Sequence, residues 1–468
     1  MQHLPALLIS LALFALSSCS SEPEKYDLVI TGVHVVDIEE DRILPNQYVA
    51  ITDNRIQRTA MMDSLVLAND QRMLDGEGRY VMPGLWDNHV HFRGGDSLAG
   101  ENKALLPLFL YHGVTTVRDA GGDLAPQVIS WRNAIAAGKL DGPNIFTPGY
   151  KIDGAQPAWP GSLKVTDEAS LERALDSLES MEVNFIKTYD GSLTPEMYYA
   201  TIDAALERGY KTTGHMPLNA DLRKAIETGL KGSEHLYYVL KAAADSLKRA
   251  ENASYKADYL TSLVRHYEEE SAREIFRLLA ENEVYVTPTL YIGKVLSELA
   301  DTDHSQDLLL DYIGEGIQQT YSRRLESALR AKEAGNNSRE ILLEEGFKKM
   351  ILPMFESGVE ILSGSDCGPF NSYVYPGSSL IEEMKMLGEC GLLPYQVLAT
   401  SVINGPAFFE LQEFYGSVEK GKVADLILLD ANPLEDIANL ETLSIVIKGG
   451  KVMGENELKT MVEQAKTP

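Results

Sequence analysis

The sequence predicts an α/β protein, a (β/α)8 TIM barrel with a small accessory β-sandwich domain built from both termini. Three observations support this prediction. Short β-like runs occur near both ends of the chain, strand-like and helical runs alternate through the long centre, and the centre holds eight candidate strands. Eight parallel βα units close a barrel. A chain of 468 residues is long enough for a barrel and a further unit.

The eight candidate strands are apolar runs, most of which end in polar residues. Their ranges are 85–92, 114–119, 144–148, 183–189, 210–215, 232–236, 284–289 and 359–366. The polar residues at or near the ends of these runs are His91, Asp119, Lys187, His215, His235 and Asp366. Because the chemistry of such barrels sits at the carboxyl ends of the strands, we expect these side chains to gather on one face.

The accessory domain is expected to combine residues 26–82 with residues 404–455, because alternating β-like runs bounded by turn residues occur in both segments. The barrel, residues 83–403, is then an insertion between the two halves of this domain. Residues 456–468 are expected to form a C-terminal tail.

Two segments of the centre, residues 237–282 and 290–358, are longer than simple loops. They are rich in Lys, Glu, Leu and Ala at helical spacing, which predicts solvated helices. The second is placed to cap the mouth of the barrel. The loop of residues 151–162, after the third strand, should overhang the same mouth, since long βα loops set specificity in barrels.

The N-terminus has the pattern of an export signal. Residues 4–16 form an apolar run that is too short for a transmembrane helix but suits a signal-peptide core. The run ends at Leu16-Ser17-Ser18-Cys19, which resembles the lipobox of bacterial lipoproteins, although no Lys or Arg precedes the run. We therefore expect a lipoprotein signal peptide (1–18), lipidation at Cys19 and a short tether (19–25). The alternative is an ordinary secretory signal with an incidental cysteine.

The amino-acid composition limits the binding partners and the cellular location that we expect for this protein. The chain has 42 Lys and Arg against 69 Asp and Glu, a net charge of −27, so it should repel nucleic acid and anionic membranes. A membrane is expected to be a partner only through the lipid anchor, on the periplasmic face or the cell surface of a bacterial envelope. Besides Cys19 only Cys367 and Cys390 occur, too few for a disulfide scaffold. Oligomeric state does not follow from these features.

His89 and His91 form the first candidate metal site. Side chains at i and i+2 of a strand project from the same face, so the two imidazoles would point together at the strand end. By itself this pair also fits a solvated strand face. His215 and His235 are likewise compatible with strand-end histidines satisfied by hydrogen bonds, and Asp366 with a turn aspartate.

Lys187 is unusual because it lies inside an apolar strand, where a charged amine is costly to desolvate. One explanation is that its stem is buried while its amine reaches water. The other is that the neutral amine adds carbon dioxide and becomes a carbamate, an anionic ligand able to bridge two metal ions.

Together these residues resemble the ordered ligands of the amidohydrolase superfamily of metal-dependent barrel hydrolases. Residues 83–91, Pro-Gly-Leu-Trp-Asp-Asn-His-Val-His, are similar to its first-strand signature. Residues 113–122, Gly-Val-Thr-Thr-Val-Arg-Asp-Ala-Gly-Gly, are similar to the second-strand signature of its imidazolonepropionase and prolidase-like branch. Residues 416–426 resemble the family's return into the accessory sheet. The resemblance covers nearly the whole mature chain.

The resemblance implies a site with two divalent metal ions. The implied ligands are His89, His91 and Asp366 for one ion, His215 and His235 for the other, and carboxylated Lys187 as the bridge. Imidazolonepropionase lacks the bridging lysine and uses one metal, so Lys187 favours the two-metal, prolidase-like members. Histidine and carboxylate ligands suit zinc, with manganese, iron or cobalt as alternatives. Carboxylation of the lysine would require carbon dioxide.

The implied reaction is hydrolysis of an amide or peptide C–N bond in a small molecule by a metal-bridged hydroxide. Asp366 would be the catalytic residue that accepts the water proton and passes it to the leaving nitrogen. A dipeptide or an N-acyl amino acid is the expected substrate. Cyclic amides, lactones or phosphoesters are alternatives, since fold and metal site do not fix the scissile bond. A non-catalytic, lipid-anchored binding protein is a third possibility.

The candidate substrate contacts are less well defined. Tyr237, Tyr238 and Tyr291 follow the sixth and seventh strands and either line the pocket or pack loop helices. Arg118 either pairs with a substrate carboxylate or forms a structural salt bridge with Asp119, and the sequence favours the salt bridge.

Overall fold

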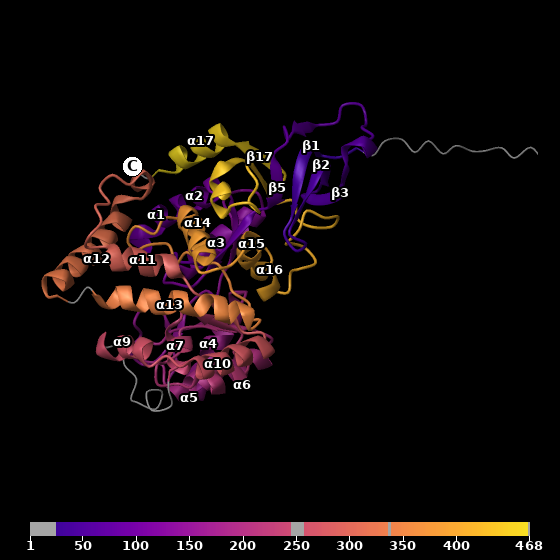
Figure 1. The fold of residues 1–468 in the computed structure, drawn as a ribbon. Coiled ribbons are helices and arrows are strands. Elements are labelled where there is room, and N and C mark those ends of the chain that lie inside the picture. Colours follow the sequence, from indigo (N-terminus) through magenta and orange to yellow (C-terminus); the bar gives the residue numbers. More distant parts are fainter. Residues whose placement is uncertain (1–24, 245–256, 336–337, 467–468) are drawn as a thin grey trace, which may run out of the picture.

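The two ends of the chain meet in one β-sheet, and the centre forms an α/β body beside it (Figure 1). The structure is a computed structural model and describes residues 25–244, 257–335 and 338–466. The expected signal peptide (1–18), Cys19 and the tether up to residue 24 lie outside the described residues. In the described part, no helix is both long and apolar enough to cross a bilayer.

The sheet formed by the chain ends has eight strands. They are β1 (Leu28–Asp37), β2 (Arg42–Thr52), β3 (Arg55–Met61), β4 (Met73–Asp75), β5 (Tyr80–Pro83), β15 (Leu426–Leu429), β16 (Leu443–Lys448) and β17 (Lys451–Gly454). The order is β17-β16-β15-β5-β1-β2-β3, and β4 also pairs with β1. Strands from both ends do share a sheet. The described residues form one sheet rather than the two packed sheets of the expected sandwich, because β4 and β5 pair with successive parts of β1.

Alternation along β1 explains how this sheet builds its core. Leu28 and Ile30 face a buried apolar cluster, and Val33 and Val35 continue it after a shift of one residue. The pairing register with β2 is irregular between Ile30 and Val33, where Gly32 has a φ of 65°. A glycine adopts this left-handed conformation without steric cost, so the extra residue is accommodated and the apolar face is restored.

Seven of the eight expected barrel strands are present, most of them shorter than predicted. They are β6 (Leu85–Val90), β7 (Val114–Asp119), β8 (Asn144–Phe146), β11 (Ile186–Thr188), β12 (Thr212–Gly214), β13 (Gly232–Glu234) and β14 (Tyr285–Thr287). The expected eighth strand is reduced to a parallel bridge between Ile361 and Val286, followed by another between Cys367 and Val90. Gly364 explains the close approach of this segment to β6, because a Cβ there would lie 2.7 Å from His89 Cβ.

The parallel strands form three sheets. Their orders are β6-β7-β8, β10-β9-β11-β12 and β13-β14, where β9 is Ile152–Asp153 and β10 is Leu163–Lys164. Single backbone bonds continue between sheets, from Asn184 N–H to Thr147 O (2.9 Å) and from Lys231 N–H to Thr212 O (3.1 Å). The described strands are therefore arranged as in a barrel, but their hydrogen-bonded ladders do not form one closed barrel.

Helices cover these strands (Figure 1). They are α1 (Ala99–Ala104), α2 (Leu106–Tyr111), α3 (Ala125–Ala136), α4 (Glu168–Ser180), α5 (Pro195–Glu207), α6 (Leu222–Thr228), α7 (Tyr237–Ala242), α9 (Ala257–Arg265), α10 (Glu269–Glu281), α11 (Leu290–Glu298), α12 (Glu315–Glu333), α13 (Ser338–Glu356), α14 (Ser378–Glu389), α15 (Pro394–Val402), α16 (Asn404–Phe408) and α17 (Glu455–Ala465). Capping residues in the sequence determine where several of these helices begin. Asp167 caps α4 through a reciprocal bond with Ser170, and Thr194 caps α5. The two long segments expected to be helical contain α7, α9 and α10, and α11 to α13.

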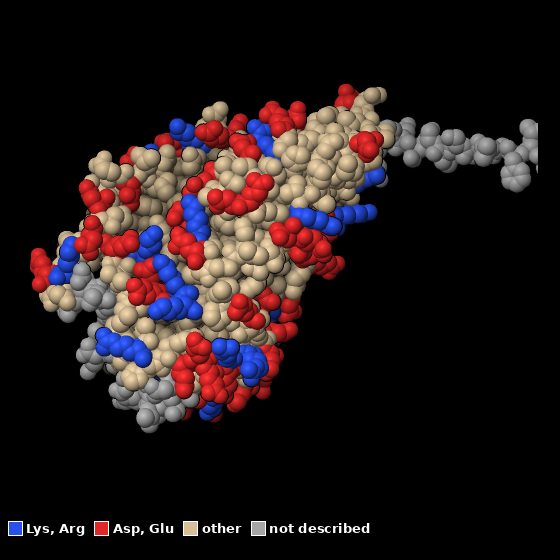
Figure 2. All heavy atoms as spheres, in the orientation of Figure 1, with Lys and Arg blue, Asp and Glu red and all other residues tan. Residues whose placement is uncertain are grey.

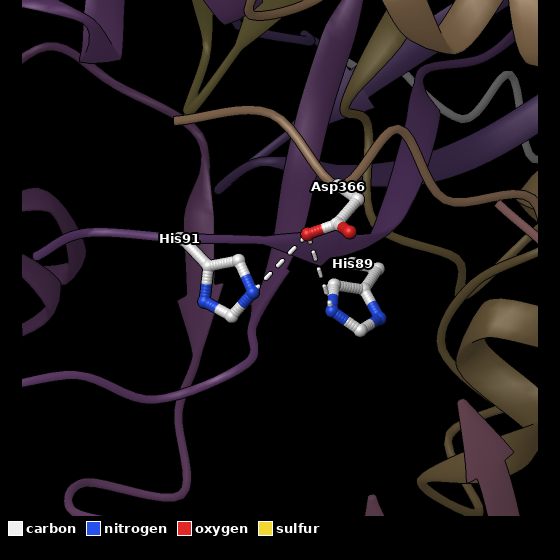
Figure 3. A group of neighbouring side chains, drawn as sticks. All are labelled: His89, His91 and Asp366. Atoms are coloured by element: carbon white, nitrogen blue, oxygen red, sulfur yellow. Dashed lines mark ion pairs between the residues drawn. The ribbon is translucent and has the colours of Figure 1, made fainter. Parts of the chain in front are cut away.

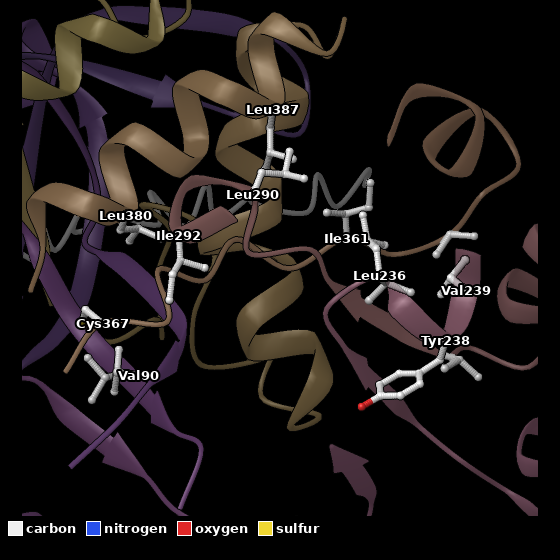
Figure 4. Close-up of a cluster of buried hydrophobic side chains, with 14 of the residues drawn as sticks. Val90, Leu236, Tyr238, Val239, Leu290, Ile292, Ile361, Cys367, Leu380 and Leu387 are labelled. Atoms are coloured by element: carbon white, nitrogen blue, oxygen red, sulfur yellow. The ribbon is translucent and has the colours of Figure 1, made fainter. Parts of the chain in front are cut away.

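The buried apolar core continues from the strands into the helices (Figure 4). Val90 and Cys367 lie side by side at the end of β6, whereas Leu380 and Leu387 come from α14. Cys367 is buried and Cys390 is partly buried, both as free thiols. Residues 456–468, expected as a tail, contain most of α17, which buries Leu458 and Val462.

The surface is acidic without a basic patch on the face shown in Figure 2. Lys and Arg side chains there are interspersed among Asp and Glu. This face, in a chain with a net charge of −27, offers no electrostatic attraction for a phosphate backbone.

Candidate metal centre

His89, His91 and Asp366 form a compact group of potential ligands (Figure 3). One donor atom from each residue lies within 4.8 Å of the others. His89 belongs to β6, His91 follows it directly, and Asp366 comes from the segment that bridges to β6 beside them. Asp366 Oδ1 is 3.2 Å from His91 Nε2 and 3.6 Å from His89 Nε2. The predicted His-x-His pair therefore points at a carboxylate, not at solvent.

Two further histidines extend this group. His215 follows β12 and His235 follows β13. Their Nε2 atoms are 3.2 Å apart, and His235 Nε2 is 4.0 Å from Asp366 Oδ2. All the residues expected as histidine or aspartate ligands thus meet at the carboxyl ends of the parallel strands, where barrel enzymes place their sites.

The four imidazoles are oriented by hydrogen bonds or ion pairs on their outer nitrogens. The Nδ1 contacts are His89 with Glu234 Oε2 (2.6 Å), His91 with the carbonyl of Gly121 (3.3 Å), His215 with Asp190 Oδ1 (3.2 Å) and His235 with Thr289 Oγ1 (2.6 Å). An acceptor that binds the N–H of one ring nitrogen fixes the tautomer and leaves the other ring nitrogen free to bind a metal ion. The four Nε2 atoms are consequently the ones that converge.

Electrostatics favour the ligand form of these rings. Burial lowers the pKa of His89 to about 4, with Lys187 adding to the effect. Burial also lowers the pKa values of His91, His215 and His235 well below 6.5. Neutral imidazole is the form that binds metal. Moreover, His89 Nε2 is buried without a hydrogen-bond partner among the described residues, as expected of a group that binds an ion. The residues therefore fit a divalent metal ion.

Lys187 lies in β11 with its side chain buried. Its Nζ has no hydrogen-bond partner in the described part of the chain, and Glu234 Oε1 is 3.8 Å away. Burial lowers the pKa of Lys187 to about 8, although the Glu234 charge partly offsets this. The amine does not reach solvent, so the explanation in which only the stem is buried does not apply.

Glu234 is a site residue that was not predicted from the sequence. Its carboxylate accepts hydrogen bonds from His89 Nδ1, from Arg118 Nη2 (2.9 Å) and from Thr213 Oγ1 (2.6 Å). Burial raises the pKa of Glu234, but the charges of Arg118 and Lys187 and the hydrogen bond from His89 outweigh this and hold it well below 4.5. Its place at the end of a buried strand, directly before His235, was the sequence signal that could have identified it.

Arg118 is engaged within this network. Its guanidinium binds Glu234, Thr287 Oγ1 (2.9 Å) and the carbonyl of Asn88 (2.6 Å). The expected salt bridge with Asp119 is wrong, because successive residues of β7 face opposite ways and Asp119 instead accepts a hydrogen bond from Thr147. Arg118 is 2% exposed, so it does not offer a charge to a ligand in the mouth of the site.

The candidate tyrosines lie near the site but are packed against protein. The ring of Tyr237 is 6.3 Å from that of His235 and 5.1 Å from that of Phe347. Tyr238 donates to Asp190 Oδ2 (3.0 Å), the carboxylate that holds His215. Burial raises the pKa of Tyr291 to about 12. Substrate contact by Tyr237 and Tyr291 stays a prediction.

Two of the proposed ligands, and a residue that contacts one of them, have a left-handed backbone conformation. His235, Asp366 and Thr289 have φ values of 61°, 56° and 51°, a left-handed conformation that is uncommon outside glycine. Gly214, directly before His215, has a φ of 136°, and a Cβ there would lie 2.3 Å from the carbonyl oxygen of Thr188. Such conformations persist at functional sites because the surrounding structure enforces them.

The barrel-like arrangement, with convergent neutral histidines and a carboxylate at its carboxyl end, defines a metal-dependent enzyme. The model of the Amidohydrolase family matches residues 80–453. The chain therefore belongs to this family, and it is a metal-binding hydrolase that acts on C–N bonds. The predicted resemblance to the superfamily is confirmed.

Relatives and solved structures agree with this membership. Ochratoxinase of Aspergillus niger is 21% identical over 446 residues, which cover 83% of this chain and 78% of the relative. The solved structure of a bottromycin amidohydrolase is similar with a TM-score of 0.73 at 20% identity, covering 93% of this chain and 90% of that chain. A Xaa-Pro dipeptidase with bound methionine gives 0.67 at 21% identity, covering 91% and 99%. These structures show that the fold is of the TIM-barrel-like α/β type.

Proposed function

We propose that this protein is a binuclear metal hydrolase that releases an amino acid from a dipeptide or an N-acyl amino acid. The proposal is carried by the convergence of four neutral histidines and Asp366 at one site, together with the buried amine of Lys187, which has no hydrogen-bond partner in the described part of the chain. The names of two similar proteins, a Xaa-Pro dipeptidase and a bottromycin amidohydrolase, support peptide or amide substrates.

His89, His91 and Asp366 would hold one ion, and His215 and His235 the other. Carboxylated Lys187 would bridge them, because a pKa of about 8 leaves a useful neutral fraction of the amine to react with carbon dioxide. Zinc is the proposed metal, since histidine and carboxylate ligands suit it. Bound ions would supply Lewis acidity and lower the pKa of a water molecule.

The protein's own groups supply proton transfer and orientation. Asp366 presents Oδ1 towards His89 and His91 and Oδ2 towards His235, so it is placed to accept the proton of the attacking water and deliver it to the leaving nitrogen. Asn371 Nδ2 donates to Asp366 Oδ1 (2.8 Å) and fixes the carboxylate.

We propose further that the mature protein is an exported bacterial lipoprotein anchored at Cys19. The apolar run of residues 4–16 followed by Leu-Ser-Ser-Cys supports this.

Metal analysis with a hydrolysis screen tests the proposed function. Purified wild type should contain about two zinc equivalents per chain and cleave members of a panel of dipeptides and N-acyl amino acids. His89→Ala should lose metal and activity, whereas His34→Ala, in the accessory sheet, should keep both. A protein that takes up no metal and cleaves no amide would refute the proposal. Preferred cleavage of lactones or phosphoesters would instead support the alternative reactions.

A further inference from the structure

A pocket of about 460 Å³ lies beside the metal centre, and two of its lining residues are cations. Arg93 and Lys151 supply these charges, and Trp159 and Phe370 supply aromatic surface. Glycines 94, 95 and 122 add backbone surface to the lining. We call this the Arg93–Lys151 pocket. Trp159 belongs to the loop of residues 151–162 that the sequence placed over the mouth.

Both cations are buried against the same indole. Arg93 is 5% exposed, and its Cζ lies 4.1 Å from the centroid of the Trp159 ring. Lys151 is 1% exposed, with its Nζ 5.3 Å from that centroid and 5.0 Å from the centroid of Tyr189. Lys151 Nζ has no hydrogen-bond partner among the described residues. Burial lowers the pKa of Lys151 well below 10.5, because a charged amine is costly to bury unless an anion lies beside it.

No acidic side chain of the lining forms an ion pair with Arg93 or Lys151, although Asp366 and Asp119, outside the lining, act on their charges. Asp123 is the acidic residue of the lining, and its Oδ1 accepts the backbone N–H of Gly94 (2.9 Å). Arg93 donates to the carbonyl of Pro369 (2.9 Å) and to Asn371 Oδ1 (3.0 Å), both neutral groups. Within the lining, neither Arg93 nor Lys151 therefore forms an ion pair, although the chain as a whole is strongly acidic.

Two contacts connect the pocket with the metal ligands. Asn371 accepts from Arg93 and donates to Asp366 Oδ1 (2.8 Å), so one side chain joins the guanidinium to the proposed proton carrier. Tyr189, which contacts Lys151, stacks on the ring of His215 with centroids 4.3 Å apart. An anionic group in the pocket would thus lie directly beside the reacting centre.

We propose that the Arg93–Lys151 pocket binds the free carboxylate of the substrate, on the carbon that bears the scissile nitrogen. This inference rests on the proposed function and names the residues that would bind the C-terminal carboxylate of its substrates. In a dipeptide or N-acyl amino acid that carboxylate is attached to the carbon next to the leaving nitrogen, so it must bind adjacent to the metals. Arg118, which the sequence offered for this role, is already occupied by Glu234.

Binding of matched acid and amide pairs tests the pocket. The probes are N-acetylglycine, N-acetyl-L-proline and N-acetyl-L-phenylalanine, each compared with its carboxamide by calorimetric titration of the metal-loaded protein. The acid of at least one pair should bind about tenfold to a hundredfold more tightly, as expected for charge-assisted hydrogen bonds. Lys151→Met keeps the apolar stem and should reduce this preference to about twofold or less.

Lys139→Met removes an exposed lysine and should leave the preference unchanged. Lys151→Gln serves as a second variant if Lys151→Met does not unfold like the wild type. Equal binding of every acid and its amide, no binding of any probe, or a preference that survives both Lys151 variants would overturn the inference.

Measured rates of hydrolysis distinguish a failure of this inference from a failure of the proposed function. Cleavage of acids and carboxamides with equal kcat/KM would leave the proposed function standing and overturn the pocket assignment. Selective, Lys151-dependent binding of the acids by a protein that hydrolyses no amide would support the pocket and refute the proposed function.

Discussion

Glu234 Oε2 lies 2.6 Å from His89 Nδ1, although the two residues are 145 positions apart in the sequence. The same carboxylate binds Arg118, so the ring of a proposed metal ligand is held by a buried ion pair. A carboxylate in this position makes the imidazole a better ligand and fixes its direction.

Replacing Glu234 should therefore weaken metal binding without touching a ligand. Glu234→Gln is expected to lower zinc affinity about tenfold to a hundredfold, because the charge behind His89 is lost. Glu234→Ala should also destabilise the fold by about 3–5 kcal/mol, since Arg118 is left as an unpaired buried charge. Competition with a chromogenic chelator and urea unfolding measure these effects.

Glu274→Gln is the matched control, because Glu274 pairs with Arg223 at the surface. It should change neither quantity appreciably. Unaltered zinc affinity in Glu234→Gln would contradict the role assigned to the Glu234–His89 contact.

Lys187→Ala should abolish hydrolysis, because it removes the proposed bridge between the ions. Added short carboxylic acids should restore part of the activity by occupying the vacated space as anionic ligands. Lys231→Ala, at a lysine bonded to the carbonyl of Asn282, should behave like the wild type. Full activity of Lys187→Ala without added acid would rule out the carbamate.

Much of the site was predictable because its signals are local. His89 and His91 share a strand face by spacing alone, and Lys187 is conspicuous within an apolar run. The pairing of Glu234 with Arg118 and the position of Asn371 depend on which strands become neighbours, and no local pattern reports this. The salt bridge between Arg118 and Asp119 was predicted for the same reason, because the sequence shows only which residues are adjacent along the chain.

The fold, like the site, was predictable where its signals are local in the sequence. Alternating β-like runs predicted strands at both ends of the chain. They did not predict that β4 and β5 would both pair with β1, which keeps all these strands in one sheet. The eighth barrel strand was expected from apolar character over residues 359–366. Gly364 and the left-handed Asp366 interrupt regular pairing there, so the segment contributes isolated bridges.

Glu383 should give the folded protein a measurable pH dependence. Burial raises its pKa from 4.5 to about 8, while its Oε2 accepts the N–H of Tyr291 (2.7 Å). A raised pKa means that the folded state holds the proton more tightly, so the stabilisation is complete below about pH 4.5 and is lost as the pH rises towards 8. Each unit of difference corresponds to about 1.4 kcal/mol.

Glu383→Gln stays neutral and can still accept the Tyr291 hydrogen bond. Its unfolding free energy relative to wild type should therefore increase between pH 5 and 8 and level off above that range. Chemical denaturation at fixed pH values measures the difference. A constant difference across the range would show that Glu383 does not titrate as its burial requires.

Cys19→Ala should release the protein from the membrane. If Cys19 carries the lipid, its loss removes both processing by the lipoprotein peptidase and the anchor. Fractionation of a bacterial host followed by immunoblotting should show wild type with the membranes and the variant as a soluble or unprocessed form. Cys390→Ala, at a partly buried thiol inside the fold, should remain with the membranes. A wild-type protein found free in the periplasm would favour an ordinary secretory signal.

Asp366→Asn tests proton transfer apart from folding. The amide can still accept the hydrogen bond from Asn371 and occupies the same volume, but it cannot take a proton from water, so kcat should fall by about 10²-fold to 10⁴-fold. Metal content, measured on the same samples, shows how much of the loss comes from weaker ligation, and thermal unfolding should stay close to that of wild type. Asp430→Asn, at a surface carboxylate paired with Arg79, should keep full activity. An Asp366→Asn variant that turns over at the wild-type rate would mean that another group carries the proton, and Asp190, which holds His215, would be the next to replace.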